Sequence, residues 1–140
     1  MLAEVGYDAP GFPSLAHPRR RLGEVGESLA RRHLEARGLE ILDANYRSRF
    51  GELDLVAADE RSLVFCEVKT RVLAGAVGEL GPFASIGADK RRRVRRMARE
   101  WLSSRTSREP WPADIRFDVI GISFDQAGRL VELDHLEAAF

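Results

Sequence analysis

The chain has 140 residues, a length that suits one domain, with 22 basic and 22 acidic residues and no net charge. A composition of 44% hydrophobic and 31% charged residues excludes a disordered acidic chain, and no run approaches the roughly 18 apolar residues of a membrane helix. The single cysteine, Cys66, excludes an intramolecular disulfide framework and a cysteine-based zinc site. We therefore expect a cytoplasmic protein with no membrane segment.

The zero net charge hides two asymmetries. Residues 51–89 carry 3 basic and 7 acidic side chains, whereas residues 90–116 carry 10 and 3. An acidic segment followed by a basic one suits a protein that binds both a cation and a polyanion. In addition, 20 of the 22 basic residues are arginine, and the only lysines are Lys69 and Lys90. These two positions are therefore candidates for a role that arginine cannot fill.

The N-terminal part divides into a tail and a helix. Residues 1–20 contain three prolines and no periodic pattern, so we expect a flexible tail before a domain over residues 21–140. Apolar residues recur at helical spacing from about Leu22, and Gly38 is expected to end this helix. Glu27 falls on or beside the buried face of the helix, which is an unusual place for a carboxylate.

The rest of the chain alternates strands and a helix. Three strands are predicted over residues 40–46, 51–58 and 63–70, the last with the apolar run of a central strand. A glycine-rich loop (71–88), an arginine-rich helix (88–104) and two strands (116–124 and 130–135) follow. This order predicts a single α/β domain whose mixed sheet of about five strands is flanked by helices.

The hairpin formed by the second and third strands carries the chemistry. If Glu60 and Arg61 form a two-residue turn, Asp54 lies opposite Glu67, and Lys69 shares the face of Glu67. The turn lacks the Asn-Gly pair that such turns favour, so the prediction depends on the register. Two adjacent carboxylates repel each other unless a cation such as Mg²⁺ or Mn²⁺ lies between them. A solvated or salt-bridged Glu-x-Lys pair is the alternative interpretation.

Two segments of this hairpin resemble the sequence motif of a known nuclease superfamily. The hairpin contains GELDL at residues 51–55 and FCEVKTR at residues 65–71. Together they resemble the core of the PD-(D/E)xK nuclease superfamily, and they are most similar to the UPF0102 family, which itself resembles Holliday-junction resolvases. The resemblance covers about residues 22–122 and implies a restriction-endonuclease-like fold. Leu53 stands where the proline of the superfamily's name would be.

The resemblance also implies roles for particular residues. Asp54 and Glu67 would be metal ligands, Glu27 an additional carboxylate near the metal, and Lys69 the catalytic lysine. The implied activity is hydrolysis of DNA phosphodiesters by a Mg²⁺- or Mn²⁺-dependent endonuclease, with structured or branched DNA as the substrate. A homodimer is expected by analogy with resolvases.

Basic residues around this site are candidate contacts to a nucleic-acid backbone, and a solvated surface is the alternative. They are Arg47, Arg49, Arg71, Lys90, Arg91, Arg92 and Arg95. Two other functions remain open: a nucleic-acid-binding module that keeps the nuclease fold but does not cut, and a protein-interaction scaffold. The three histidines share no metal-ligand spacing, and His33 is expected in the core or at its boundary.

Overall fold

The computed structural model describes residues 18–73, 86–105 and 110–140. Within these residues the chain forms two helices and five strands, which are α1 (Pro18–Ala36), β1 (Glu40–Ser48), β2 (Gly51–Ala58), β3 (Ser62–Val72), α2 (Ala88–Ser103), β4 (Asp114–Phe124) and β5 (Leu130–Leu136). The strands form one sheet in the order β1-β2-β3-β4-β5. The β3–β4 pair is parallel and the other pairs are antiparallel, so the sheet is mixed, as predicted.

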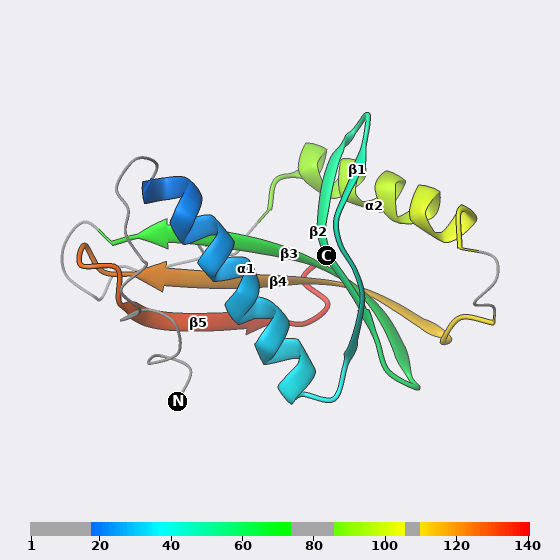
Figure 1. Cartoon of the computed structure of the whole chain (residues 1–140). Coiled ribbons are helices and arrows are strands. Elements are labelled where there is room, and N and C mark those ends of the chain that lie inside the picture. The colour runs from blue at the N-terminus through cyan, green and yellow to red at the C-terminus, as the bar shows by residue number, and fades with distance from the viewer. Residues whose placement is uncertain (1–17, 74–85, 106–109) are drawn as a thin grey trace.

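The two helices cover opposite faces of this sheet (Figure 1). Val64 and Cys66 pack with residues of α1, whereas Leu63 and Phe65 pack with residues of α2. Successive side chains of a strand point to opposite faces, so this alternation along β3 places a hydrophobic core on each side of it. Helix α2 lies on the connection between the parallel strands β3 and β4, as parallel pairing requires. The arrangement is consistent with a restriction-endonuclease-like fold.

Several element boundaries differ from the predicted ones, among them the start of α1 and the end of β3. Helix α1 begins at Pro18 rather than near Leu22, because proline is well suited to the first turn although it breaks the apolar pattern. Strand β3 continues to Val72, so Arg71 belongs to a strand and not to the predicted loop. Most of that loop and most of the predicted tail lie outside the described residues. Across the described segments, no helix is long and apolar enough to cross a membrane.

Helix α1 ends as the sequence predicts. Gly38 has a φ of 90°, a value that favours glycine. Its N–H donates to the carbonyl of Glu35, and the N–H of Leu39 donates to the carbonyl of Leu34, each at 3.0 Å. These two bonds form the usual glycine-dependent helix stop. The chain then turns directly into β1.

The predicted register of the β2–β3 hairpin is confirmed. Leu55 faces Cys66 and Ala58 faces Leu63, as a two-residue turn requires. The turn is held by Asp59, whose Oδ1 accepts the N–H groups of Arg61 and Ser62 at 2.9 and 2.8 Å. This Asp-based turn replaces the absent Asn-Gly pair.

Strand β2 leaves its neighbour β3 at the position where the candidate site begins. It pairs with β3 only from Leu55 to Ala58, whereas it pairs with β1 along its whole length, back to Gly51. The β1–β2 hairpin therefore separates from β3 and rises to the top of the view in Figure 1. Asp54 is the first residue of β2 beyond this divergence.

Candidate active site

Asp54 and Glu67 lie side by side where β2 and β3 diverge. Extending the hairpin register by one residue places them opposite each other. Their carboxyl groups form a hydrogen bond, and the N–H of Val68 donates to Asp54 Oδ2 at 2.8 Å. A hydrogen bond between two carboxyl groups needs one of them protonated. The predicted pair is therefore in contact, and it holds a proton when no cation is bound.

Glu67 is the buried member of the pair. It is 3% exposed, and its Oε1 has no hydrogen-bond partner among the described residues. Burial, followed by the hydrogen bond and negative charge of Asp54, raises the pKa of Glu67 to about 9, although Lys90 acts in the opposite direction. A buried carboxyl oxygen without a donor is costly in a folded protein. This residue thus has a feature that a cation would satisfy.

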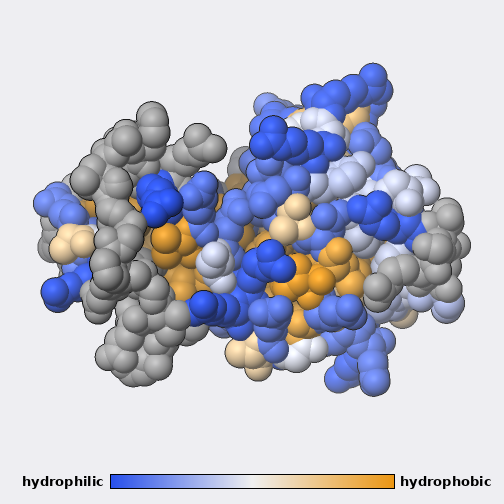
Figure 2. Space-filling model, in the orientation of Figure 1, coloured by the Kyte–Doolittle hydropathy of each residue, from blue (hydrophilic) through white to orange (hydrophobic). Residues whose placement is uncertain are grey.

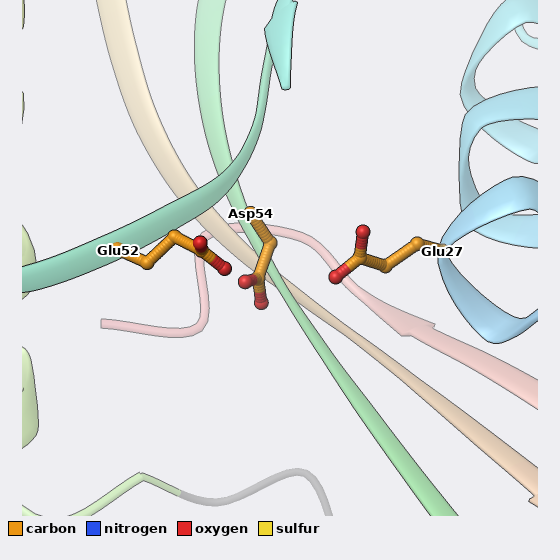
Figure 3. Close-up of side chains that lie close together, drawn as sticks. All are labelled: Glu27, Glu52 and Asp54. Atoms are coloured by element: carbon orange, nitrogen blue, oxygen red, sulfur yellow. The ribbon is translucent and has the colours of Figure 1, made fainter. Parts of the chain in front are cut away.

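Asp54 also belongs to a second group of carboxylates. Oxygen atoms of Glu27, Glu52 and Asp54 lie within 4.8 Å of one another. Figure 3 shows Asp54 between the other two, with Glu27 reaching across from α1 and Glu52 coming from β2. Burial, followed by the charge of Asp54, raises the pKa of Glu27. The predicted convergence of Glu27 with Asp54 is therefore present, and Glu52 adds a carboxylate that sequence reasoning missed.

Asn45 on β1 also contacts Glu27. Its side chain hydrogen-bonds Glu27, which favours the charged form of that carboxylate. Asn45 has a φ of 56°, a left-handed conformation that asparagine tolerates better than most residues. Its neighbours Ala44 and Tyr46 pair with Leu55 and Leu53, so Asn45 lies across β1–β2 from Asp54. Strained backbone of this kind is frequent at functional sites.

A glycine brings α1 close enough for Glu27 to reach the site. A Cβ atom added to Gly26 would lie 2.4 Å from Thr70 Oγ1. Only glycine therefore permits this approach of α1 to β3 without a shift. Because Gly26 precedes Glu27 and Thr70 follows Lys69, this close contact lies beside both candidate residues.

The two lysines of the chain meet in one pocket. This cavity, of about 270 Å³, is lined by Asp54, Glu67, Val68, Lys69, Ile86, Gly87 and Lys90. Lys69 lies two residues beyond Glu67 on β3 and is half-buried. Lys90 comes from the first turn of α2, and its Nζ lies 3.8 Å from Glu67 Oε1. The rarity of lysine in the sequence thus marked two residues of the same site.

These residues fit a hard divalent cation. Such ions prefer oxygen ligands, and Mg²⁺ commonly uses one or two carboxylates and keeps water in its other positions. The unpartnered Oε1 of Glu67 and the repelling group of Glu27, Glu52 and Asp54 both supply oxygens that a cation would stabilise. Asp54, which touches both sets, is the residue best placed to bind the cation.

The predicted nucleic-acid contacts are spread over three elements. On the β1–β2 hairpin, Arg47 Nε lies 3.4 Å from Glu52 Oε2, and the Arg49 guanidinium lies 5.0 Å from the Phe50 ring centre. On β3, Arg71 donates to Ser123 Oγ at 3.3 Å. Lys90 lines the pocket, and the other predicted contacts are Arg91, Arg92 and Arg95 on α2.

The α2 arginines have individual partners. Arg92 pairs with Asp89, and Arg91 Nε donates to the carbonyl of Ile86 at 2.8 Å. The guanidinium of Arg95 lies over the rings of Phe117 and Phe140. Arg91 and Arg95 therefore also hold the end of the chain against α2. Arg96, in the same arginine-rich run of α2, has its guanidinium 4.1 Å from the centre of the Phe50 ring.

Glu52 could have been found from the sequence, because it lies two residues before Asp54 on the same strand. Period-two alternation puts such residues on one face. Asn45 gave a weaker signal. Its place opposite Asp54 depends on the β1–β2 pairing, and the strand pattern does not predict its left-handed backbone.

A second polar cluster lies within the core on the α1 side. Asp118 is fully buried, accepts two hydrogen bonds from Arg116 and contacts His135 Nε2 at 2.8 Å. His33 Nε2 lies 2.9 Å from His135 Nδ1, and His33 is half-buried at the boundary of the core, as expected. Burial acts to raise the pKa of Asp118, but these hydrogen bonds and one from Ala138 hold it below its usual value. This cluster links α1 to β4 and β5.

Fold and site together define an α/β domain with a carboxylate-rich pocket where two central strands diverge. The sequence profile of the Uncharacterised protein family UPF0102 matches residues 26–122, and the chain belongs to this family. It is 47% identical over 121 residues to a UPF0102 protein of Parafrankia sp. (strain EAN1pec), covering 86% of this chain and 97% of the relative. It is 44% identical over 119 residues to that of Rhodococcus opacus (strain B4), with coverage of 85% and 95%. The UPF0102 protein of Alkaliphilus oremlandii (strain OhILAs) is 37% identical over 122 residues, with coverage of 86% and 98%.

Proposed function

We propose that this protein is a metal-dependent nuclease that hydrolyses DNA phosphodiesters and acts on structured or branched DNA. One observation carries the proposal: Asp54, Glu67 and Lys69 line a single pocket at the divergence of β2 and β3. Glu27 joins Asp54 there from α1. Carboxylates that can hold a metal ion, beside an amine that can stabilise developing negative charge, suit metal-assisted phosphodiester hydrolysis.

The roles follow from position and charge. Asp54, Glu67 and Glu27 would hold Mg²⁺ or Mn²⁺, and the ion would supply Lewis-acid stabilisation of the charge that develops on the phosphate. Lys69 would donate hydrogen bonds that orient the attacking water and stabilise the same charge. Lysine suits this role better than arginine, because its compact ammonium group fits beside two carboxylates.

The basic residues of the hairpin and of α2 would bind the DNA backbone without reading its sequence. Figure 2 shows a mostly hydrophilic surface over α2 and the β1–β2 turn. Phe50 lies at this turn under the guanidinium groups of Arg49 and Arg96. Guanidinium groups stacked on a ring keep N–H donors available for phosphate oxygens.

Cleavage of branched, flapped and duplex DNA by the full chain with Mg²⁺ or Mn²⁺ tests the proposal. We expect cleavage by the wild type and loss of it in Lys69→Ala, with branched or flapped DNA preferred. Arg129→Ala is a matched control, because Arg129 is an exposed basic residue in the turn between β4 and β5. Equal cleavage by the wild type and Lys69→Ala would contradict the proposed catalytic role of Lys69.

The second candidate is a nucleic-acid-binding module that does not cut. The observation in its favour is that most α2 arginines lie outside the carboxylate pocket, so the basic surface needs no metal to bind a polyanion. It predicts salt-sensitive binding without metal-dependent turnover. Calorimetric titration of Mg²⁺ or Mn²⁺ separates the candidates, because a metal site that Asp54→Ala abolishes favours the nuclease.

A further inference from the structure

The pocket at the β2–β3 divergence has two walls of opposite character. Asp54 and Glu67 form an acidic wall, and the start of α2 contributes Lys90, whose Nζ lies 3.8 Å from Glu67 Oε1, to the same lining. Lys69 adds a second ammonium group to the lining. A site for a cation alone needs only the acidic wall. The basic wall therefore indicates that an anion enters the same pocket.

The start of α2 is built to face an anion. Its N-cap residue is Gly87, which is extended (φ −68°, ψ 162°) and forms no side-chain cap. The first N–H groups of a helix have no acceptor within the helix, and the helix dipole adds positive potential at this end. Among the described residues, no atom lies within 4 Å of a Cβ atom added at Gly87, so none of them fills this position beside the first turn. Anions commonly bind at such positions.

The acidic wall gives an independent indication of a ligand. Glu67 is 3% exposed and lines the pocket, and no residue in the described part of the chain forms a hydrogen bond with its Oε1. The Lys90 ammonium, at 3.8 Å from Oε1, is attracted by charge but too far away to donate a hydrogen bond. Lys90 and Glu67 therefore form an ion pair without a hydrogen bond, and a divalent cation together with a phosphate group would give Glu67 Oε1 a direct ligand and the Lys90 ammonium a hydrogen-bond acceptor.

We propose that the first turn of α2, with Gly87 and Lys90, is a subsite for a phosphate group beside the Asp54–Glu67 pair. The inference rests on the proposed function for the nature of its substrate, a nucleic-acid phosphate. It assigns Lys90 to the reacting end of the substrate, and it separates Lys90 from the arginines on the exposed side of α2. The simpler interpretation, in which Lys90 only neutralises Glu67, predicts no phosphate binding at this helix end.

The test uses inorganic phosphate and the full chain, at constant ionic strength, with and without Mg²⁺. Amide chemical shifts of Ala88, Asp89 and Lys90 are followed by NMR, because these N–H groups would contact the anion. We expect saturable shifts at these positions, and binding about tenfold weaker in Lys90→Gln, since a hydrogen bond to a charged group is lost. Arg129→Gln, which removes an exposed charge elsewhere, should bind as the wild type does.

A second variant guards against misfolding. Gly87→Asp places a carboxylate at the N-cap, where it caps the helix and competes with an incoming anion. We expect a higher melting temperature together with loss of the phosphate-induced shifts. Shifts spread evenly over the α2 arginines, shifts that do not saturate, or unchanged binding in Lys90→Gln would overturn the inference.

The outcome is distinguishable from failure of the proposed function. Saturable phosphate binding at α2 without DNA cleavage would support the phosphate subsite and contradict the proposed nuclease function. Metal-dependent DNA cleavage without phosphate-induced shifts at α2 would support the nuclease function and contradict the phosphate subsite.

Discussion

Glu67 and Asp54 form a hydrogen bond between two carboxyl groups, one on each of two adjacent strands. The pair lies at the end of the β2–β3 register, where residues 18–73, 86–105 and 110–140 provide no hydrogen-bond donor to Glu67 Oε1. Without a cation, the folded protein therefore keeps a proton on the pair at neutral pH. This relationship makes both stability and metal binding depend on pH.

The stability of the metal-free protein should fall as the pH rises. Glu67 has an ordinary pKa of 4.5 when unfolded and a pKa of about 9 when folded, so the folded state binds a proton that the unfolded state releases. The contribution of this proton is complete below the unfolded pKa and is lost as the pH rises towards the folded value. As the pH rises, Glu67→Gln, which mimics the protonated acid, should become increasingly more stable than the wild type, by at most about 1.4 kcal/mol per pH unit.

Urea unfolding in EDTA between about pH 5 and about pH 8 measures this difference. Taking the difference between variant and wild type cancels the other groups that titrate in the same range, such as His33, whose pKa is lowered by burial and by His135. A stability difference that stays constant across this range would contradict the assignment of the proton to Glu67.

Metal binding should release that proton. Because Glu67 is protonated in the metal-free protein at neutral pH, the apparent affinity for Mg²⁺ or Mn²⁺ should rise about tenfold per pH unit between about pH 6 and about pH 8. Calorimetric titrations in two buffers of different ionisation enthalpy count the protons released. Glu67→Gln should bind metal more weakly and without this pH dependence. An affinity that does not change with pH would mean that Glu67 is not a ligand.

Glu52 should contribute to the same metal centre. Its carboxylate lies within 4.8 Å of those of Glu27 and Asp54, so a cation there would be stabilised by all three. We expect Glu52→Gln to weaken Mg²⁺ or Mn²⁺ binding about tenfold, the loss of one charged ligand. Glu60→Gln, an exposed carboxylate in the β2–β3 turn, is the control and should leave binding unchanged. If Glu52→Gln and Glu60→Gln bound the metal with the same affinity, Glu52 would not be a ligand, and the metal centre would consist only of the carboxylates predicted from the sequence.

The local parts of the site could be predicted from the sequence, and the tertiary ones could not. A two-residue turn fixes which residues face each other, so the Asp54–Glu67 pairing followed from chain positions alone. The turn chemistry was harder to recognise, because Asp59 stabilises it through its side chain instead of an Asn-Gly pair. Period two then placed Lys69 near Glu67 without knowledge of the rest of the fold.

Contacts between segments that are distant in the chain could not be predicted from the sequence pattern in this way. Glu27 could be recognised as misplaced on a buried helix face, but its partners depend on how α1 crosses the sheet. The left-handed backbone of Asn45 and the contact between His33 and His135, 102 residues apart, arise only from the assembled fold. Sequence periodicity describes single elements, so it could not find groups that three elements build together.

The approach of α1 to β3 gives the last prediction, since Gly26 permits it. In Gly26→Ala the new Cβ would lie 2.4 Å from Thr70 Oγ1, on a β-branched side chain with little rotational freedom. The helix must then shift and carry Glu27 away from Asp54. We expect a loss of about 1–3 kcal/mol in unfolding free energy and weaker metal binding.

Gly23→Ala is the matched control for this prediction, because it lies on the same helix and its added Cβ would meet nothing within 4 Å. It should gain roughly 0.5–1 kcal/mol from the higher helix propensity of alanine and leave metal binding unchanged. Thr70→Ala removes the clashing hydroxyl, so Gly26→Ala combined with Thr70→Ala should recover much of the lost metal affinity. If Gly26→Ala instead matched Gly23→Ala in stability and metal affinity, close packing at Thr70 would not be what positions Glu27.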